Sequence, residues 1–226
     1  MKKTVQITIR LLSVSLLAVH SVMAQGSITY VSNLGQTPSG SVSVGANAWY
    51  AGDFVSGTNA GGYLLDTVQL EMTDASGDPN SFTVMIYTGP DILGGNRPGS
   101  SLGTLLGSAN PTAAGVYTYT SSSSLQLLAN TVYFVVITAG TQTSGGVYSW
   151  SATSDPSTGY TAYLWGGETT FAESTDGLNW NYVPSGFGQF ALNATATPEP
   201  GVVGLLALGV SLFGLRRWNE KKKHPN

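Results

Sequence analysis

Short runs of strand-forming residues, each bounded by turn-forming residues, constrain the fold of this chain more than any other feature. Between Gln25 and Ala196, segments rich in Val, Tyr, Thr and Phe alternate with stretches of Gly, Ser, Asn and Pro. This pattern predicts short β-strands, and no window keeps the 3.6-residue period of a helix. The predicted strands cover residues 27–33, 47–55, 62–72, 81–89, 115–121, 125–129, 131–139, 146–152, 159–165, 169–174 and 188–196.

Hydrophobic alternation indicates how these strands are buried. In the run "LLDTVQLEM", the predicted apolar face holds Leu64, Val68, Leu70 and Met72, with Asp66 in the same register. Such alternation is typical of an antiparallel sheet with one solvated side. The run "TVYFVVIT" is apolar on both faces, which predicts a central strand. About ten such strands in about 170 residues predict an all-β fold, an antiparallel β-sandwich of the jelly-roll type.

The first 24 residues have the order of a secretory signal peptide. A basic region containing two lysines and an arginine is followed by the apolar run "LLSVSLLAVHSV" and then by "VMA". This order predicts a signal peptide that is cleaved between Ala24 and Gln25; a helix of the domain is the alternative. Export leaves residues 25–195 as the folded domain. That domain has no Cys, so its core alone must stabilise it.

The C-terminal segment, residues 196–226, combines an extended stretch, an apolar run and a basic cluster. Residues 201–215 carry no charge. A helix of that length spans about 22 Å, somewhat less than the hydrocarbon core of about 30 Å. Trp218 at the interface and snorkelling arginines allow a marginal transmembrane helix. The basic tail, residues 216–226, is expected to stay in the cytoplasm, which leaves the domain in the periplasm.

The segment "TPEP" is predicted to be extended, because proline disfavours a helix at its own position and before it. The motif Pro198-Glu199-Pro200, followed by the apolar run and by Arg216 and Arg217, resembles the PEP-CTERM sorting signal of Gram-negative bacteria. The resemblance implies cleavage by the membrane transpeptidase exosortase after a transient stay in the inner membrane. It also implies a final location at the cell surface or in the extracellular matrix, often alongside exopolysaccharide. An ordinary single-span anchor is the alternative.

The body of the chain resembles a family of surface domains called choice-of-anchor R. The matching features are Asn33-Leu34-Gly35, Phe54 with the following "GT", the Tyr63–Met72 strand, and the runs "PGSSLGTL" and "LLANTVYFVVI". The resemblance covers most of residues 28–193. It implies a fold and a surface role, and no catalytic residue comes with it.

Composition excludes several kinds of chemistry. The body holds no Cys and no His, so a Ser-His-Asp triad, a Cys-His pair and an ordinary zinc site are excluded. Between residues 25 and 197, ten acidic residues stand against one basic residue, Arg97, which gives a formal net charge of −9. Such a body repels phosphate backbones, so nucleic acid is not an expected partner. We predict that the protein is not an enzyme.

A glycosidase is the least favoured alternative, since it needs two carboxylates that face one cleft. Glu168 and Glu173 are the nearest late pair, but their odd separation puts them on opposite faces of a continuous strand. The run "STDGLNW" resembles the Asp-box hairpin of sialidases, but it is one residue too short between Asp176 and Trp180. A tight Asp-Gly hairpin is the better interpretation.

Calcium is the only cofactor that the sequence suggests. The run "DASGDPN" places oxygen-bearing side chains at Asp74, Ser76, Asp78 and Asn80. This spacing is similar to that of a calcium loop, although Met85 stands where an EF-hand has its glutamate. An ordinary hairpin turn is the competing interpretation.

Aromatic residues suggest a ligand for the domain. Exposed aromatic faces stack on sugar rings, and we expect Trp165 in "YTAYLWGG" and Trp180 in "LNWNYV" to be the stacking residues. Core or cross-strand packing is the more common role of large aromatics. The sequence therefore predicts an exported, non-enzymatic structural or adhesive protein of an exopolysaccharide or biofilm matrix. A carbohydrate-binding module is the alternative.

Overall fold

Strands make up nearly all of the regular structure in the part of the chain that the structure describes. This computed structural model describes residues 26–75, 81–89, 97–107, 110–145, 147–155, 165–166, 170–184 and 186–198. The predicted signal peptide, apolar run and basic tail lie outside these residues. Among the described residues, the only helical element is a single 3₁₀ turn, η1 (Thr143–Gly145).

Most of the strands are rich in β-branched and aromatic side chains, which fit a pleated, half-buried surface. In chain order they are β1 (Ile28–Ser32), β2 (Gly40–Val44), β3 (Trp49–Val55), β4 (Tyr63–Asp74), β5 (Thr83–Thr88), β6 (Ser101–Gly107), β7 (Gly115–Leu127), β8 (Val132–Thr138), β9 (Tyr148–Thr153), β10 (Phe171–Ser174), β11 (Trp180–Val183), β12 (Phe187–Gly188) and β13 (Phe190–Ala196).

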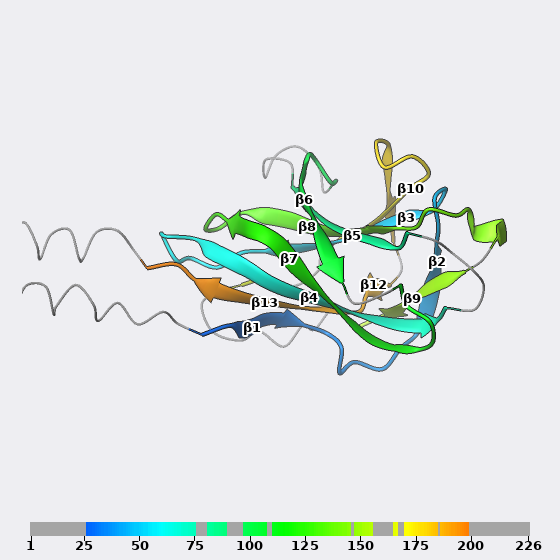
Figure 1. The fold of residues 1–226 in the computed structure, drawn as a ribbon, viewed down its shortest axis with the longest axis horizontal. Helices are drawn as coiled ribbons and strands as arrows, with labels where there is room; N and C mark the ends of the chain where they lie inside the picture. The colour runs from blue at the N-terminus through cyan, green and yellow to red at the C-terminus, as the bar shows by residue number, and fades with distance from the viewer. Residues whose placement is uncertain are drawn as a thin grey trace, which may run out of the picture. The chain divides into compact units, whose positions relative to one another are not determined.

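The strands form one antiparallel sheet that curls on itself (Figure 1). Its order is β1-β13-β4-β7-β6-β5-β8-β3-β10-β11, and β9 pairs with β2, β12 and the end of β4. Strands β5, β6 and β7 are successive neighbours, and β8 returns to lie beside β5, which is the order of a Greek key. The prediction of an all-β, antiparallel fold is therefore confirmed.

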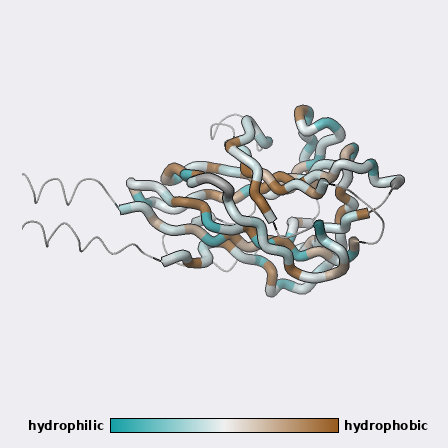
Figure 2. Tube along the Cα trace, viewed as in Figure 1, coloured by the Kyte–Doolittle hydropathy of each residue, from teal (hydrophilic) through white to brown (hydrophobic). Residues whose placement is uncertain are grey.

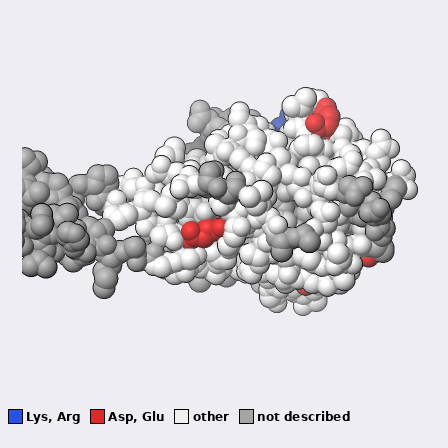
Figure 3. Space-filling model, viewed as in Figure 1, with Lys and Arg blue, Asp and Glu red and all other residues white. Residues whose placement is uncertain are grey.

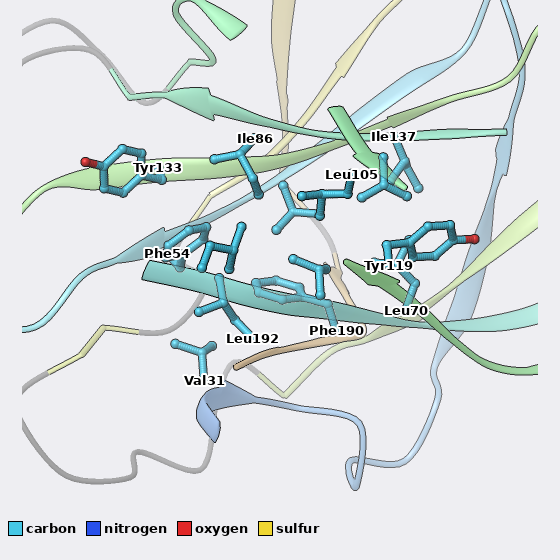
Figure 4. Packing of buried hydrophobic residues seen from close by; sticks show 14 of the residues in the cluster. Val31, Phe54, Leu70, Ile86, Leu105, Tyr119, Tyr133, Ile137, Phe190 and Leu192 are labelled. Carbon is cyan, nitrogen blue, oxygen red and sulfur yellow. The ribbon is translucent and has the colours of Figure 1, made fainter. Parts of the chain in front are cut away.

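The main hydrophobic core lies between two parts of the curled sheet that face each other. Figure 4 shows Leu70, Phe190 and Leu192, from β4 and β13, on one side of this core. Phe54 and Ile86, from β3 and β5, lie on the other side, and all five side chains are buried. Along the strands, hydrophobic and hydrophilic positions follow one another at short intervals (Figure 2), as expected for strands with one buried face.

Strand β4 departs from the alternation that its sequence predicts. Leu65 is buried, whereas Leu64, which was expected on the apolar face with Val68, is only half-buried. The prediction is wrong here because the register of β4 shifts against both neighbouring strands just after Leu65. Such a β-bulge turns the following side chains to the other face. Asp66 is thereby kept out of the core, and its Oδ2 accepts a hydrogen bond from Thr195 Oγ1 at 2.8 Å.

A second, smaller hydrophobic cluster lies on the opposite, outer face of β3, β5, β8, β10 and β11. It consists of Ala51, Met85, Phe134, Val136, Ala172 and Trp180. Strand β8 therefore packs on both faces, and its residues from Tyr133 to Thr138 are all buried. This confirms the prediction that "TVYFVVIT" is a central strand.

Candidate functional site

Both tryptophans that were predicted to stack on sugars are buried, which corrects that prediction. Trp165 is only 1% exposed; its ring stacks on Tyr30 with centroids 4.6 Å apart and meets the edge of Tyr63 at 4.8 Å. Trp180 is 4% exposed and packs in the outer cluster with Ala172. Aromatic packing of this kind stabilises the fold. Neither indole ring offers a free face to a ligand.

The run of residues 174–180 forms the tight β10–β11 hairpin, and Asp176 lies at the centre of its turn. The backbone N–H groups of Leu178 and Asn179 each donate to Asp176 Oδ1 at 2.8 Å, and Asn179 Nδ2 donates to Oδ2 at 2.8 Å. These hydrogen bonds hold the pKa of the Asp176 carboxyl well below its usual range, and the bond from the backbone N–H of Asn179 contributes most to this lowering. The carboxylate therefore orders its own turn.

Glu173 is the one member of the weighed carboxylate pair that the structure describes, because Glu168 lies outside the described residues. Glu173 is exposed on β10, directly opposite Tyr50 of β3. Burial, and then the negative charge of Glu173, raise the pKa of the Tyr50 phenol. In the sheet, Glu173 thus lies between Tyr50 of β3 and Asn181 of β11.

The predicted calcium site falls mostly outside the described residues. Asp74, the last residue of β4, is described and exposed. Ser76, Asp78 and Asn80 lie outside the described residues. Within the residues that are described, His, Cys, Asp and Glu side chains form no group of three or more that could hold a metal ion. The calcium prediction at Asp74–Asn80 stays a prediction.

A buried polar network ties the turn after β1 to the last strands of the domain. The Asn33 amide donates to a backbone carbonyl of β12 at 2.9 Å, and Asn33 Oδ1 accepts from the Phe190 N–H at 2.7 Å. Gln189 Nε2 donates to the carbonyls of Asn33 and Gln36, and Gln189 Oε1 accepts from the Ser151 hydroxyl. Asn33, one of the residues behind the surface-domain resemblance, therefore has a structural role.

Both ends of the domain leave the sheet at the same place. Strands β1 and β13 are antiparallel neighbours, with Ile28 opposite Ala194. Strand β13 ends at Ala196, and Pro198, the first residue of the predicted sorting motif, is exposed. No helix within the described residues is long and apolar enough to cross a membrane. The other residues of the two predicted processing signals lie outside the described part of the chain: Ala24, Gln25, Glu199, Pro200, Arg216 and Arg217.

Tyr182 is an exposed aromatic residue that the sequence analysis did not single out. Its side chain is 61% exposed on β11, directly opposite Ala172 of β10. Trp180 and Tyr182 are two residues apart, so both side chains point to the same face of the strand. The alternation in "LNWNYV" could have indicated this shared face. It could not have shown that Trp180 packs into the outer cluster while Tyr182 remains accessible.

The outer face of β1, β13, β4 and β7 carries a transverse row of uncharged polar side chains. The row consists of Thr29, Asn193, Thr67 and Thr120, each directly opposite the next in the register of the sheet. Residues directly opposite in antiparallel strands share a face. Thr29 Oγ1 donates to Asn193 Oδ1 at 2.5 Å, and Asn193 Nδ2 donates to Thr67 Oγ1 at 2.7 Å.

A second polar row lies beside the first. Gln69 of β4 is directly opposite Thr118 of β7, and Gln69 Nε2 donates to Thr118 Oγ1 at 3.3 Å. We call the surface formed by both rows the polar face, and it consists of Thr29, Thr67, Gln69, Thr118, Thr120 and Asn193. Sequence analysis missed it because only the strand order brings these residues together.

Comparison with known proteins assigns no family to this chain. No protein-family model matches the sequence, and no curated protein is similar to it.

Proposed function

We propose that this protein is exported, processed at both ends, and active outside the cell as a non-enzymatic structural or adhesive component. The signal peptide directs export, and the C-terminal helix then holds the precursor in the inner membrane with its domain in the periplasm. Exosortase cuts near Pro198–Pro200 and frees the domain for the cell surface or matrix. The order of the C-terminal segment carries this proposal: the Pro-Glu-Pro motif, the uncharged run of residues 201–215, and the basic cluster from Arg216.

The position of the last strand supports a cut at this motif. Strand β13 ends at Ala196 and its Leu192 and Ala194 are buried, so a cut at or after Pro198 removes none of the described strands and none of the described core residues. The product keeps every strand of the described sheet. We interpret that curled sheet as a variant of the jelly-roll-like sandwich, and its Greek key order supports this interpretation.

The low density of charged side chains on the surface supports a role in a hydrated matrix. Arg97 is the single Lys or Arg among the described residues, and Figure 3 shows a surface on which charged side chains are few and scattered. A surface with a single basic side chain does not attract anionic partners through its electrostatic field. Association through hydrogen bonds and apolar contacts is the remaining route.

The sorting step can be tested with the full chain in a Gram-negative host that has an exosortase. We expect wild-type protein to lose its C-terminal segment, as followed by antibodies against the domain and against residues 216–226. Pro198→Ala combined with Glu199→Ala should leave uncut precursor in the inner-membrane fraction. Thr197→Ala is the matched control and should be cut like the wild type. Normal release of the double variant would overturn the role of the motif.

Carbohydrate binding through surface aromatics is the second candidate function, and the exposure of Tyr182 favours it. An accessible phenol ring with a polar edge suits the mixed apolar and polar surface of a sugar. If this ring stacks on a glycan, Tyr182→Ala should weaken binding on a glycan array and leave the melting temperature close to that of the wild type. Binding that does not depend on Tyr182 would exclude this ring as the contact.

A further inference from the structure

Five of the six side chains of the polar face hydrogen-bond with one another, and the sixth, Thr120, donates its hydroxyl to the Leu106 carbonyl at 3.0 Å. Thr29, Asn193 and Thr67 form a continuous chain of hydrogen bonds across three strands, and Gln69 and Thr118 form a further pair. Groups that are already ordered lose less conformational entropy when a ligand binds them than freely rotating side chains do. The polar face is therefore a preorganised array of hydroxyl and amide groups. Hydroxyls and amides both donate and accept hydrogen bonds.

The charges around the polar face select against ionic partners. Strands β1, β4, β7 and β13 contain no Lys or Arg, and their acidic residues are Asp66, Glu71 and Asp74, all on β4. In Figure 3, the surface over β4 and β13 shows one small acidic patch and no basic residue. A polyanion finds no basic side chain to pair with on such a surface, and the acidic residues of β4 repel it weakly. An uncharged polymer of hydroxyl groups meets no such penalty.

The regularity of the polar face favours a chain over a single sugar. Neighbouring strands are about 4.8 Å apart, and successive residues on one face of a strand are about 6.8 Å apart. The row from Thr29 to Thr120 repeats its polar groups across four strands. A repeating set of donors and acceptors matches a polymer whose hydroxyl groups also repeat.

We propose that the polar face binds a neutral polysaccharide chain, with the hydroxyl and amide groups of its six residues as hydrogen-bond partners. This inference rests on the proposed location outside the cell, and it names the component of the matrix that the domain contacts. It places the contact on strands β1, β13, β4 and β7, whereas the ring of Tyr182 lies on β11.

The proposal can be tested with the protein purified from the cells that export it. Retention on immobilised dextran and amylose is compared with retention on alginate, an anionic polymer. The test variant is Thr118→Val with Thr120→Val, because both residues are exposed and valine keeps the shape and strand preference of threonine. The matched control is Thr104→Val, which removes an exposed hydroxyl from β6, outside the polar face.

We expect wild-type protein to bind a neutral polymer with little dependence on salt, and the double variant to bind about tenfold more weakly, since it loses two contacts of ordinary hydrogen-bond strength. Thr104→Val and Tyr182→Ala should bind like the wild type. If the double variant melts at a lower temperature, Gln69→Leu replaces it.

Several outcomes would overturn the proposal. These are wild-type affinity in the polar-face variants, retention on alginate alone, no retention on either neutral polymer, or a loss confined to Tyr182→Ala. The termini of the same purified sample, read by mass spectrometry, separate a failure of polysaccharide binding from a failure of the proposed export and processing.

Discussion

Gln189 shows how one buried side chain joins several segments of this domain. Its Nε2 donates to the Asn33 carbonyl at 3.1 Å and to the Gln36 carbonyl at 2.8 Å, and its Oε1 accepts from Ser151. Gln189 is fully buried. The sequence gives no sign of this role, because glutamine is mostly an exposed residue. Only the packing of β9, β12 and the turn after β1 around one point reveals it.

Gln189→Leu should destabilise the domain strongly, although the substitution barely changes the volume of the side chain. Leucine fills the same space, but two carbonyls and one hydroxyl lose their buried partner, at a cost of about 2–4 kcal/mol in the free energy of unfolding. Urea denaturation measures this cost. Gln126→Leu is the matched control, because Gln126 is exposed, and it should change stability by less than about 0.5 kcal/mol. Equal stability of the two variants would contradict the role of the network.

The carboxylate of Asp176 should protect the β10–β11 turn over most of the pH range. Its folded-state pKa lies below the unfolded value of about 4, so its stabilising effect is complete above that value and declines only at lower pH. Amide hydrogen exchange at Leu178 and Asn179 reports on the turn. Exchange should be faster in Asp176→Ala at pH 6, while wild-type protection persists down to about pH 4. Identical exchange rates in the two proteins would refute this.

Most strands in which side chains with high β-propensity cluster were predictable, although β11, with the run "WNYV", was not. Strands β3, β4, β5, β8 and β13 fall largely within the predicted runs. Strands β2 and β6 were missed because "GSVSV" and "SLGTLLG" are rich in Ser and Gly, which have low β-propensity. These segments are held in the extended conformation by pairing with β9 and β5. Strand β7 joins two predicted runs, 115–121 and 125–129, through the intervening serines. The predicted strand 159–165 lies mostly outside the described residues.

The candidate sites were less predictable than the strands, since they depend on which side chains the fold covers. The predicted sorting motif at Pro198–Pro200 is a local pattern, so it can be proposed from the sequence alone. The burial of Trp165 depends on Tyr30 and Tyr63, which are more than a hundred residues away in sequence. The polar face likewise requires the strand order β1-β13-β4-β7. Long-range pairing of this kind leaves no local pattern in the sequence.

The packing of the short strand β12 against Trp150 can be tested by a substitution at Gly188. A Cβ at this position would lie 2.2 Å from an atom of the Trp150 ring, so Gly188→Ala forces the buried indole to move. Overpacking of this kind costs about 1–3 kcal/mol. Thermal unfolding should show a clear fall in melting temperature. The control is Gly40→Ala on β2, where the added methyl meets open space, and little change is expected. A melting temperature unaffected by Gly188→Ala would show that β12 does not pack as described.

The first and last strands of the domain, β1 and β13, pair with each other at one edge of the sheet. Strand β1 pairs only with β13 among the described strands, and Ile28 lies opposite Ala194. The first strand therefore finds its partner only after the last strand has emerged, and pairings between distant segments form slowly. In an exported chain, this order places the completion of the sheet after translocation. The two predicted processing signals come before β1 and after β13 in the sequence, so their removal would keep both strands.

The mass of the intact exported protein tests the central claim most directly. Protein collected from outside the cells should begin at Gln25 and end close to Pro198–Pro200, with every strand from β1 to β13 retained. A second form that keeps the C-terminal segment is expected only in the membrane fraction. Recovery of extracellular protein with Met1 or with an intact end at Asn226 would contradict the account.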